Sequence, residues 1–176
     1  GKPITVDDYM NARMIADPMS VLDCDIPVDG VTAFVLTSAE RARDLPNKPV
    51  YVAGYAQGHP KSHSWLFSSL DDVMEGGKET ADMLWKHTGL SRNDIDVPQI
   101  YDGFSPLIYF WLESLGFCPR GEAHRFVQGG TIDFDGKFPM LSGGGSLGNG
   151  RMHGVPHMLE CYQQLSQRAH GRQLKK

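Results

Sequence analysis

The chain of 176 residues is long enough for one domain with a sizeable core, and its composition, 40% hydrophobic and 22% charged, is that of a soluble globular protein. A net charge of −4 gives no global electrostatic basis for nucleic-acid binding, and no apolar run reaches the roughly 20 residues of a membrane helix. The widely spaced Cys24, Cys118 and Cys161 fit neither disulfides nor a metal site, so we expect reduced thiols and a cytoplasmic protein.

The first third of the chain alternates helical and apolar segments. Thr5 is a candidate cap for a helix that runs over 9–15 and ends before Pro18. The apolar, partly β-branched segments 32–37 and 50–55 are typical of buried strands. Between them, 38–43 is predicted to be helical.

The middle of the chain predicts one long helix. Apolar residues recur at helical spacing over 70–85, with an interruption expected at Gly76 and Gly77, and Gly89 is a candidate C-cap. The polar and aromatic segment 62–67, just before this helix, is predicted to be a loop that covers a site.

The remaining elements complete an α/β pattern. Residues 97–101 predict a third strand, 105–115 a buried helix with Pro106 in its first turn, and 150–165 contains a further helix. We therefore expect 33–36, 50–55 and 97–101 to share one sheet that is covered by helices. The whole chain, 1–176, is interpreted as one domain.

The first candidate site lies where the predicted third strand ends. Tyr101 and Asp102 are followed by Gly103, which permits a sharp turn, and a helix begins at Ser105. A tyrosine beside a helix N-terminus can donate a hydrogen bond to a developing oxyanion or relay a proton. The alternative is structural: a packed tyrosine, with Asp102 as a helix cap.

The second candidate site is a glycine-rich loop, residues 141–154, that opens a helix. Its backbone N–H groups can approach an anionic ligand closely, and it ends in Arg151 and His153. It lacks the Gly-Lys-Ser/Thr ending of a P-loop and does not match the dinucleotide fingerprint. Functional and purely structural interpretations both remain open from these residues alone.

Read together and in order, these segments resemble the C-terminal half of thiolases of the sterol-carrier and lipid-transfer type. The motifs that carry the resemblance are Asp8-Tyr-x-x-Ala-Arg-Met-Ile-x-x-Pro18, Leu22-Asp-Cys-Asp-x-x-x-Asp-Gly30, Tyr101-Asp-Gly-Phe104, Leu115-Gly-Phe-Cys-x-x-Gly121, the glycine-rich loop and Gly171-Arg-Gln173. The resemblance implies a thiolase-like half-fold, a mixed sheet covered by helices, without the closing C-terminal strands. It also implies that the chain is a fragment of a longer enzyme.

Two departures from the thiolase pattern narrow the resemblance. Thiolases of this type have His-Asp-x-Phe where this chain has Tyr101, and Gly-His-Pro where it has Gly150, Arg151 and Met152. The first substitution resembles a branch of aldolases in steroid side-chain breakdown, which use tyrosines and pair with a small OB-fold protein. Arg151 does not supply the second tyrosine of that branch.

The resemblance implies an enzyme that makes or breaks a carbon–carbon bond beside a coenzyme A thioester, either an acetyl-CoA acetyltransferase-like acyltransferase or a retro-aldolase (lyase) acting on a steroid or fatty β-hydroxyacyl-CoA. The expected catalytic residues are Tyr101, Arg151 and His153. The expected substrate-binding residues are Asp102, Gly144, Gly145 and Gly150.

The resemblance also implies partners. We expect an acyl-CoA substrate, an N-terminal thiolase half that brings the nucleophilic cysteine, a homodimer, a small OB-fold partner protein, and no tightly bound cofactor or metal. By itself the chain is expected to be inactive. The competing hypotheses are a non-catalytic acyl-CoA or lipid-binding subunit, which the loss of both signature histidines favours, and a purely structural half.

Overall fold

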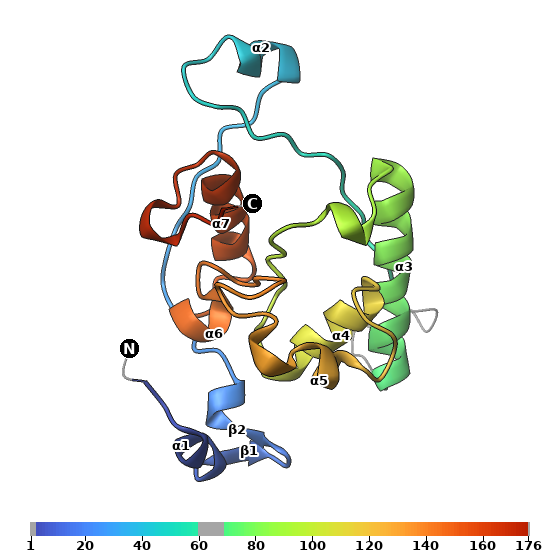
Figure 1. The fold of residues 1–176 in the computed structure, drawn as a ribbon, viewed down its shortest axis with the longest axis vertical. Helices are drawn as coiled ribbons and strands as arrows, with labels where there is room; N and C mark the ends of the chain where they lie inside the picture. Colours follow the sequence, from blue (N-terminus) through green and yellow to red (C-terminus); the bar gives the residue numbers. More distant parts are fainter. Residues whose placement is uncertain (1–2, 60–68, 176) are drawn as a thin grey trace.

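The computed structural model describes residues 3–59 and 69–175, and most of its regular structure is helical (Figure 1). Its helices are α1 (Val6–Met10), α2 (Ala39–Arg43), α3 (Leu70–Thr88), α4 (Ser105–Ser114), α5 (Ala123–Phe126), α6 (Gly145–Asn149) and α7 (Val155–Leu165). Single 3₁₀ turns cover Val21–Asp23, Arg92–Asp94, Gln128–Gly130 and His170–Arg172. Strands β1 (Met14–Ala16) and β2 (Met19–Ser20) pair antiparallel. No described helix is long and apolar enough to cross a membrane.

The N-terminal helix begins where the sequence predicts and ends earlier. The Thr5 hydroxyl accepts from the Asp8 backbone N–H at 3.1 Å and the Asp8 carboxylate accepts in return from the Thr5 N–H, which forms a capping box. The predicted continuation over 9–15 is wrong. The Asn11 side chain caps the last turn at the Asp7 carbonyl, and the chain then folds back as the β1–β2 hairpin.

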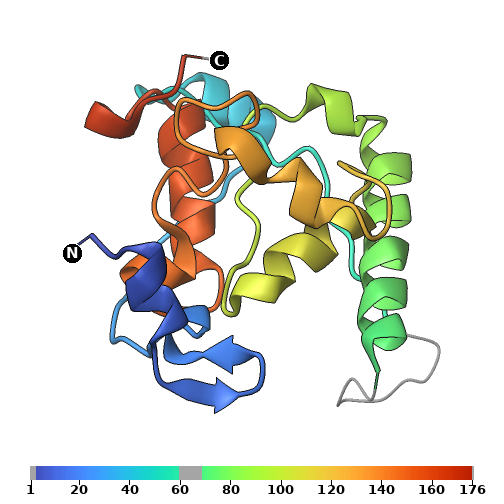
Figure 2. The same ribbon diagram turned by 60° about the horizontal axis from the view of Figure 1, so that its bottom comes forward.

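The long helix α3 is continuous, so the predicted interruption at Gly76 and Gly77 is wrong. Both glycines are buried inside the helix, where α3 packs against α4 (Figures 1 and 2). A Cβ at Gly77 would lie 2.6 Å from the Ser114 Oγ, so glycine serves helix packing here. The predicted cap is confirmed: Gly89 ends the helix in the left-handed region, at φ 68°.

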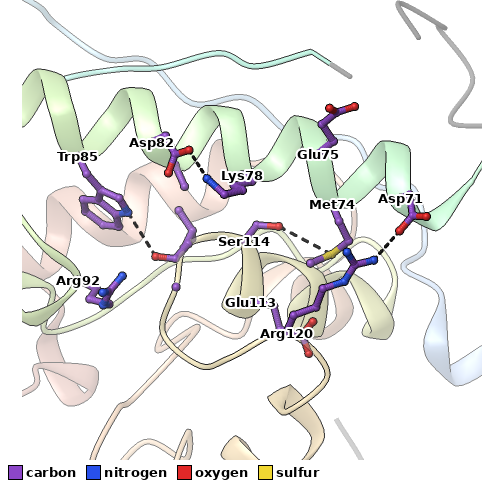
Figure 3. Close-up of a pocket in the computed structure, with 13 residues that line it drawn as sticks. Asp71, Met74, Glu75, Lys78, Asp82, Trp85, Arg92, Glu113, Ser114 and Arg120 are labelled. Atoms are coloured by element: carbon purple, nitrogen blue, oxygen red, sulfur yellow. Dashed lines mark hydrogen bonds and ion pairs between the residues drawn. The ribbon is translucent and has the colours of Figure 1, made fainter. Parts of the chain in front are cut away.

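A charged groove of about 730 Å³ lies between α3 and α4 (Figure 3). Arg120 pairs with Asp71 across it, and the Trp85 indole N–H donates to the Leu115 carbonyl at 3.3 Å. None of the residues that the sequence predicts for a site lines this groove.

The hydrophobic core gathers around α4, the helix predicted over 105–115. Leu112 is fully buried there, together with Ile100, Cys118, Ala123 and Met140. Aromatic rings close one side of this core; the Phe117 and Phe138 ring centroids are 4.7 Å apart. The core therefore fixes the chain on both sides of the Tyr101–Phe104 turn.

The predicted sheet of 33–36, 50–55 and 97–101 is not present in the described residues, where β1 and β2 are the only paired strands. The predicted strands run as single segments without a ladder partner. In the first two, the apolar side chains lie in solvent, with Val35 93% and Tyr55 84% exposed. Since a strand is stabilised by its neighbours, an apolar pattern without a neighbour does not produce a sheet. Helix α2 between them is confirmed, capped by Ser38, whereas the predicted loop 62–67 lies outside the described residues.

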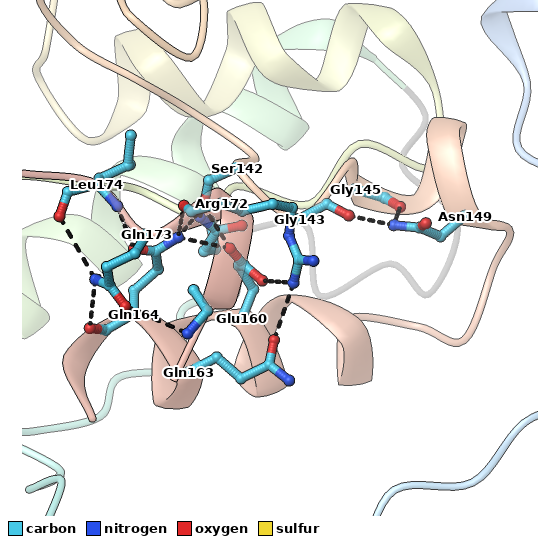
Figure 4. Close-up of polar contacts among 12 residues, drawn as sticks. Ser142, Gly143, Gly145, Asn149, Glu160, Gln163, Gln164, Arg172, Gln173 and Leu174 are labelled. Atoms are coloured by element: carbon cyan, nitrogen blue, oxygen red, sulfur yellow. Dashed lines mark hydrogen bonds and ion pairs between the residues drawn. The ribbon is translucent and has the colours of Figure 1, made fainter. Parts of the chain in front are cut away.

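A buried carboxylate, that of Glu160 on α7, ties the C-terminal turn to the glycine-rich loop (Figure 4). It accepts hydrogen bonds from the Ser142 hydroxyl at 2.8 Å, the Gln164 amide at 2.8 Å and the Arg172 guanidinium at 2.9 Å. Burial raises the Glu160 pKa, but these three donors outweigh it and hold the pKa below its usual range. The loop that carries Gly143 is thereby held against α7.

Replacing Glu160 by Gln should lower the free energy of unfolding at pH 7 by about 1–3 kcal/mol, because a buried ionic hydrogen bond is lost. The contribution of Glu160 is fully present above the usual glutamate pKa of about 4.3 and is lost as pH falls through the lowered folded-state pKa. Urea unfolding of both proteins should therefore show a gap at pH 7 that narrows towards pH 3.

Glu122→Gln is the matched control, since Glu122 pairs with Arg125 on the surface. Its effect should stay below about 0.5 kcal/mol. A gap between wild type and Glu160→Gln that is equal at pH 7 and pH 3 would contradict the ionised, hydrogen-bonded state of Glu160.

Candidate active site

Residues 24–27 bring the two predicted sites together. On one side the Asp25 backbone N–H donates to the Gly103 carbonyl at 3.1 Å, and the backbones of Cys24 and Phe104 form an isolated antiparallel β-bridge. On the other side the Arg151 N–H donates to the Ile26 carbonyl at 2.8 Å. This segment therefore lies between the Tyr101–Phe104 turn and the end of the glycine-rich loop.

The Asp102 carboxylate, at the same junction, is buried and fully engaged. It accepts from the Ser146 N–H at 2.6 Å and the Leu147 N–H at 3.1 Å, and it bonds the His157 Nε2 at 2.9 Å. Burial raises the Asp102 pKa, but the bonds from His157 and the two backbone donors hold it below its usual range. Gly145 lies so close that a Cβ there would overlap the carboxylate, and its φ is +60°.

Tyr101 lies half-buried among charged and aromatic groups. Its ring stacks on His153 with centroids 6.4 Å apart and is tilted against His157 at 5.8 Å. Burial raises the Tyr101 pKa, and the Asp25 carboxylate raises it further, while the Arg151 guanidinium opposes them without prevailing. Tyr101 is therefore a neutral phenol at physiological pH.

Arg151 is directed at the Asp25 carboxylate. Their nearest atoms, Nη1 and Oδ1, are 3.5 Å apart, and the Asp25 side chain is 1% exposed against 32% for Arg151. The guanidinium therefore balances a buried charge and also reaches solvent, where an anionic ligand can approach.

Three buried side-chain atoms in the described part of the chain lack a hydrogen-bond partner: Asp25 Oδ2, Ser146 Oγ and His157 Nδ1. All three belong to residues around Tyr101 and Asp102. A buried polar atom without a partner costs about 1–3 kcal/mol, so such atoms concentrate where a ligand can use them. Their concentration at this junction marks it as the candidate site.

Tyr101 lies beside His153 and within the electrostatic influence of Arg151, and the catalytic roles of these three residues stay predictions. Gly144 precedes α6 with φ +94°, and a Cβ at Gly150, also at φ +94°, would overlap Val28. These two glycines and Gly145 thus let the loop pack closely on its neighbours. The substrate-binding roles of Asp102, Gly144, Gly145 and Gly150 stay predictions.

Sequence reasoning missed Asp25 and His157. Asp25 lies inside the Leu22–Gly30 motif but carries no local sign of a site. His157 follows His153 by four residues, but only His157 lies in α7, and both rings lie near Tyr101. The nearness of the two histidines in the sequence indicates a site only once Tyr101 is known to lie beside both rings.

Comparisons with known proteins agree with this architecture. Residues 58–176 match the family described as thiolase C-terminal domain-like. The chain is 41% identical over 169 residues to a 17-hydroxy-3-oxo-4-pregnene-20-carboxyl-CoA lyase of Mycobacterium tuberculosis, over 94% of this chain and 44% of that protein. It is 38% identical to a steroid side-chain-cleaving aldolase of Thermomonospora curvata, over 91% of this chain and 42% of the relative.

A solved structure, the Ltp2-ChsH2(DUF35) aldolase, superimposes with a TM-score of 0.79 at 33% identity, over 95% of this chain and 44% of that one. The chain therefore spans less than half the length of these relatives. The match over residues 58–176 covers more than half of the chain, and the chain thus belongs to the thiolase C-terminal domain-like family.

Proposed function

We propose that this chain forms the C-terminal domain of a retro-aldolase that cleaves a carbon–carbon bond in a steroid or fatty β-hydroxyacyl-CoA. The observation that carries the proposal is a neutral tyrosine, Tyr101, held among Asp25, Arg151 and His153. Two relatives named as an acyl-CoA lyase and a side-chain-cleaving aldolase support it. The coenzyme A thioester is the substrate, with no tightly bound cofactor.

In this reaction Tyr101 lies at the β-hydroxyl of the substrate. A neutral phenol relays a proton when it accepts one on its oxygen while giving up its own. The carbon–carbon bond then breaks towards the thioester, and an enolate develops on the thioester oxygen. Arg151 and N–H groups of the glycine-rich loop stabilise that charge, and His153, stacked on Tyr101, lines the same site.

A thiolase-type Claisen reaction is the second candidate, favoured by similarity to an acetyl-CoA acetyltransferase of Methanothermobacter thermautotrophicus at 32% identity. It needs a reactive thiolate. Burial raises the pKa of Cys118 to about 11. The nucleophile would therefore come from an N-terminal thiolase half.

That N-terminal half is also part of the proposal. The exposed apolar side chains of 31–36 and 51–55 suit strands that gain partners from another part of a complete enzyme, which would build the expected mixed sheet. A homodimer and a small OB-fold partner protein belong to the same proposal. The two-component name of the solved Ltp2-ChsH2(DUF35) aldolase supports a partner protein.

Replacing Tyr101 by Phe in the complete enzyme should lower kcat for β-hydroxyacyl-CoA cleavage by roughly 10²–10⁴, because one acid–base group is lost. Binding of the CoA ester should change little, since the ring remains. Steady-state kinetics with a fluorescence or calorimetric Kd check this. Tyr109→Phe, on α4, is the matched control. Unchanged turnover in Tyr101→Phe would favour the non-catalytic acyl-CoA-binding subunit instead.

Replacing Arg151 by Ala should raise KM and lower kcat, each roughly tenfold, because its charge acts on bound substrate and on the enolate alike. The substitution also leaves the Asp25 carboxylate without its cation, so the unfolding temperature should fall. Arg168→Ala, which removes an exposed guanidinium bonded to Asn47, is the control and should leave KM, kcat and the unfolding temperature unchanged.

Cleavage should not depend on the cysteines of this chain. A variant with Cys24, Cys118 and Cys161 all replaced by Ala should keep its turnover per folded molecule, since burial raises the pKa of the Cys118 thiol and the Cys24 thiol donates to the Ser20 carbonyl. Loss of turnover with retained circular dichroism would shift the assignment towards covalent catalysis by one of these thiols.

A further inference from the structure

We propose that Asp25 is the proton acceptor behind Tyr101: the phenol passes its proton to the Asp25 carboxylate as it takes one from the substrate. This inference rests on the proposed retro-aldol function and adds to it a residue that acts through Tyr101. Asp25 is therefore a positioning and relay residue, whereas Tyr101 contacts the reacting oxygen.

The backbone fixes Asp25 beside the Tyr101 turn. Its N–H donates to the carbonyl of Gly103, two residues after Tyr101, at 3.1 Å. The backbone of the preceding residue, Cys24, forms a β-bridge with Phe104. The carboxylate is buried, so its position is set by the protein and not by solvent. The Asp25 carboxylate adds to burial in raising the Tyr101 pKa, while Arg151, 3.5 Å from Asp25, lowers it, so Asp25 and Arg151 act on the same phenol.

The Asp25 carboxylate also has the capacity to accept. Its Oδ1 faces the Arg151 guanidinium at 3.5 Å, which keeps the charge of a buried acid compensated. Its Oδ2 is buried and without a hydrogen-bond partner among the described groups. One oxygen is thus held by a cation, and the other is available for a proton.

The other groups around Tyr101 are less suited to this role. Both oxygens of Asp102 are engaged by backbone donors and by His157. His157 has an unpartnered Nδ1, but its Nε2 bonds Asp102, and its ring is tilted by 51° against the Tyr101 ring with centroids 5.8 Å apart. His153 stacks face to face and is exposed. Arg151 has no acceptor atom.

The step conserves protons and electrons. The β-hydroxyl proton moves to the Tyr101 oxygen while the Tyr101 proton moves to Asp25, and the β-oxygen becomes a carbonyl as the Cα–Cβ bond breaks. The bonding pair becomes the thioester enolate. The proton then returns from Asp25 through Tyr101 to the α-carbon, which releases a shortened acyl-CoA and a ketone, or an aldehyde where the β-hydroxyl is secondary, and restores both residues. No oxidant, reductant or further reactant is required.

The test compares Asp25→Asn with Asp29→Asn, the matched control in the same segment, where Asp29 is exposed. In the complete enzyme, Asp25→Asn should lower kcat by roughly 10²–10³ with little change in KM. Asp29→Asn should behave as wild type. Asp25→Glu, which keeps the carboxylate, should recover part of kcat.

A second readout does not need turnover. In protein labelled with ¹³C at tyrosine Cζ, with the Tyr101 signal assigned through Tyr101→Phe, the ionisation of Tyr101 is followed over the alkaline range in which circular dichroism shows a folded chain. Removing the Asp25 charge should raise the ratio of tyrosinate to tyrosine at a given pH by roughly tenfold, and Asp29→Asn should leave it unchanged.

The outcomes separate the two proposals. An Asp25→Asn variant with wild-type kcat, or with an unchanged Tyr101 titration, overturns the relay. A wild-type enzyme that does not cleave β-hydroxyacyl-CoA overturns the proposed function, whereas the titration still reports on the Asp25–Tyr101 pair. If Asp25→Asn does not fold, Asp25→Ser, which also lacks the carboxylate, decides: wild-type kcat overturns the relay, and a lowered kcat with unchanged KM supports it.

Discussion

The Asp102 carboxylate is the point at which two distant parts of the chain are held together. It accepts from the N–H groups of Ser146 and Leu147, at the positive end of α6, and from His157 at the start of α7. A buried negative charge is tolerable only when donors surround it, so the glycine-rich loop and α7 must both close on Asp102. That requirement explains Gly145, where any side chain would overlap the carboxylate, and it fixes the neighbouring Tyr101.

The sequence predicts the helices well and the sheet poorly, for a physical reason. Helix signals are local: Ser38 and Thr5 cap the helices that follow them, Pro106 lies in a first turn and Gly89 takes the left-handed cap. A strand is defined by what lies beside it, and an apolar run such as 50–55 cannot report whether a neighbour is present. Gly76 and Gly77 do not interrupt α3, because these positions are buried where the helix packs against α4 and a side chain at Gly77 would overlap Ser114.

The residues of the candidate site likewise fall into those that local sequence motifs predict and those that only tertiary contacts identify. Tyr101 and Arg151 belong to motifs that can be recognised from their immediate neighbours, a turn after an apolar run and a glycine-rich loop. The relevance of Asp25 arises only from bonds to residues far along the chain, at Gly103 and at Arg151 through Ile26. His157 likewise becomes informative once Asp102 is known to bond it. Local motifs therefore identify the members of this site that begin or end elements, and tertiary contacts supply the rest.

The electrostatic setting of Tyr101 bears on which reaction suits it. Had Arg151 faced the phenol alone, it would have favoured tyrosinate, a base suited to deprotonating a cysteine or an α-carbon. With Asp25 beside both groups, the cation and the carboxylate oppose one another, and burial keeps the phenol neutral. A neutral phenol can hold a donor and an acceptor contact at once, which matches a proton that leaves one oxygen and later returns to carbon. Claisen chemistry instead needs a standing base beside a thiolate. The charges around Tyr101 thus fit the aldol direction better than the thiolase one.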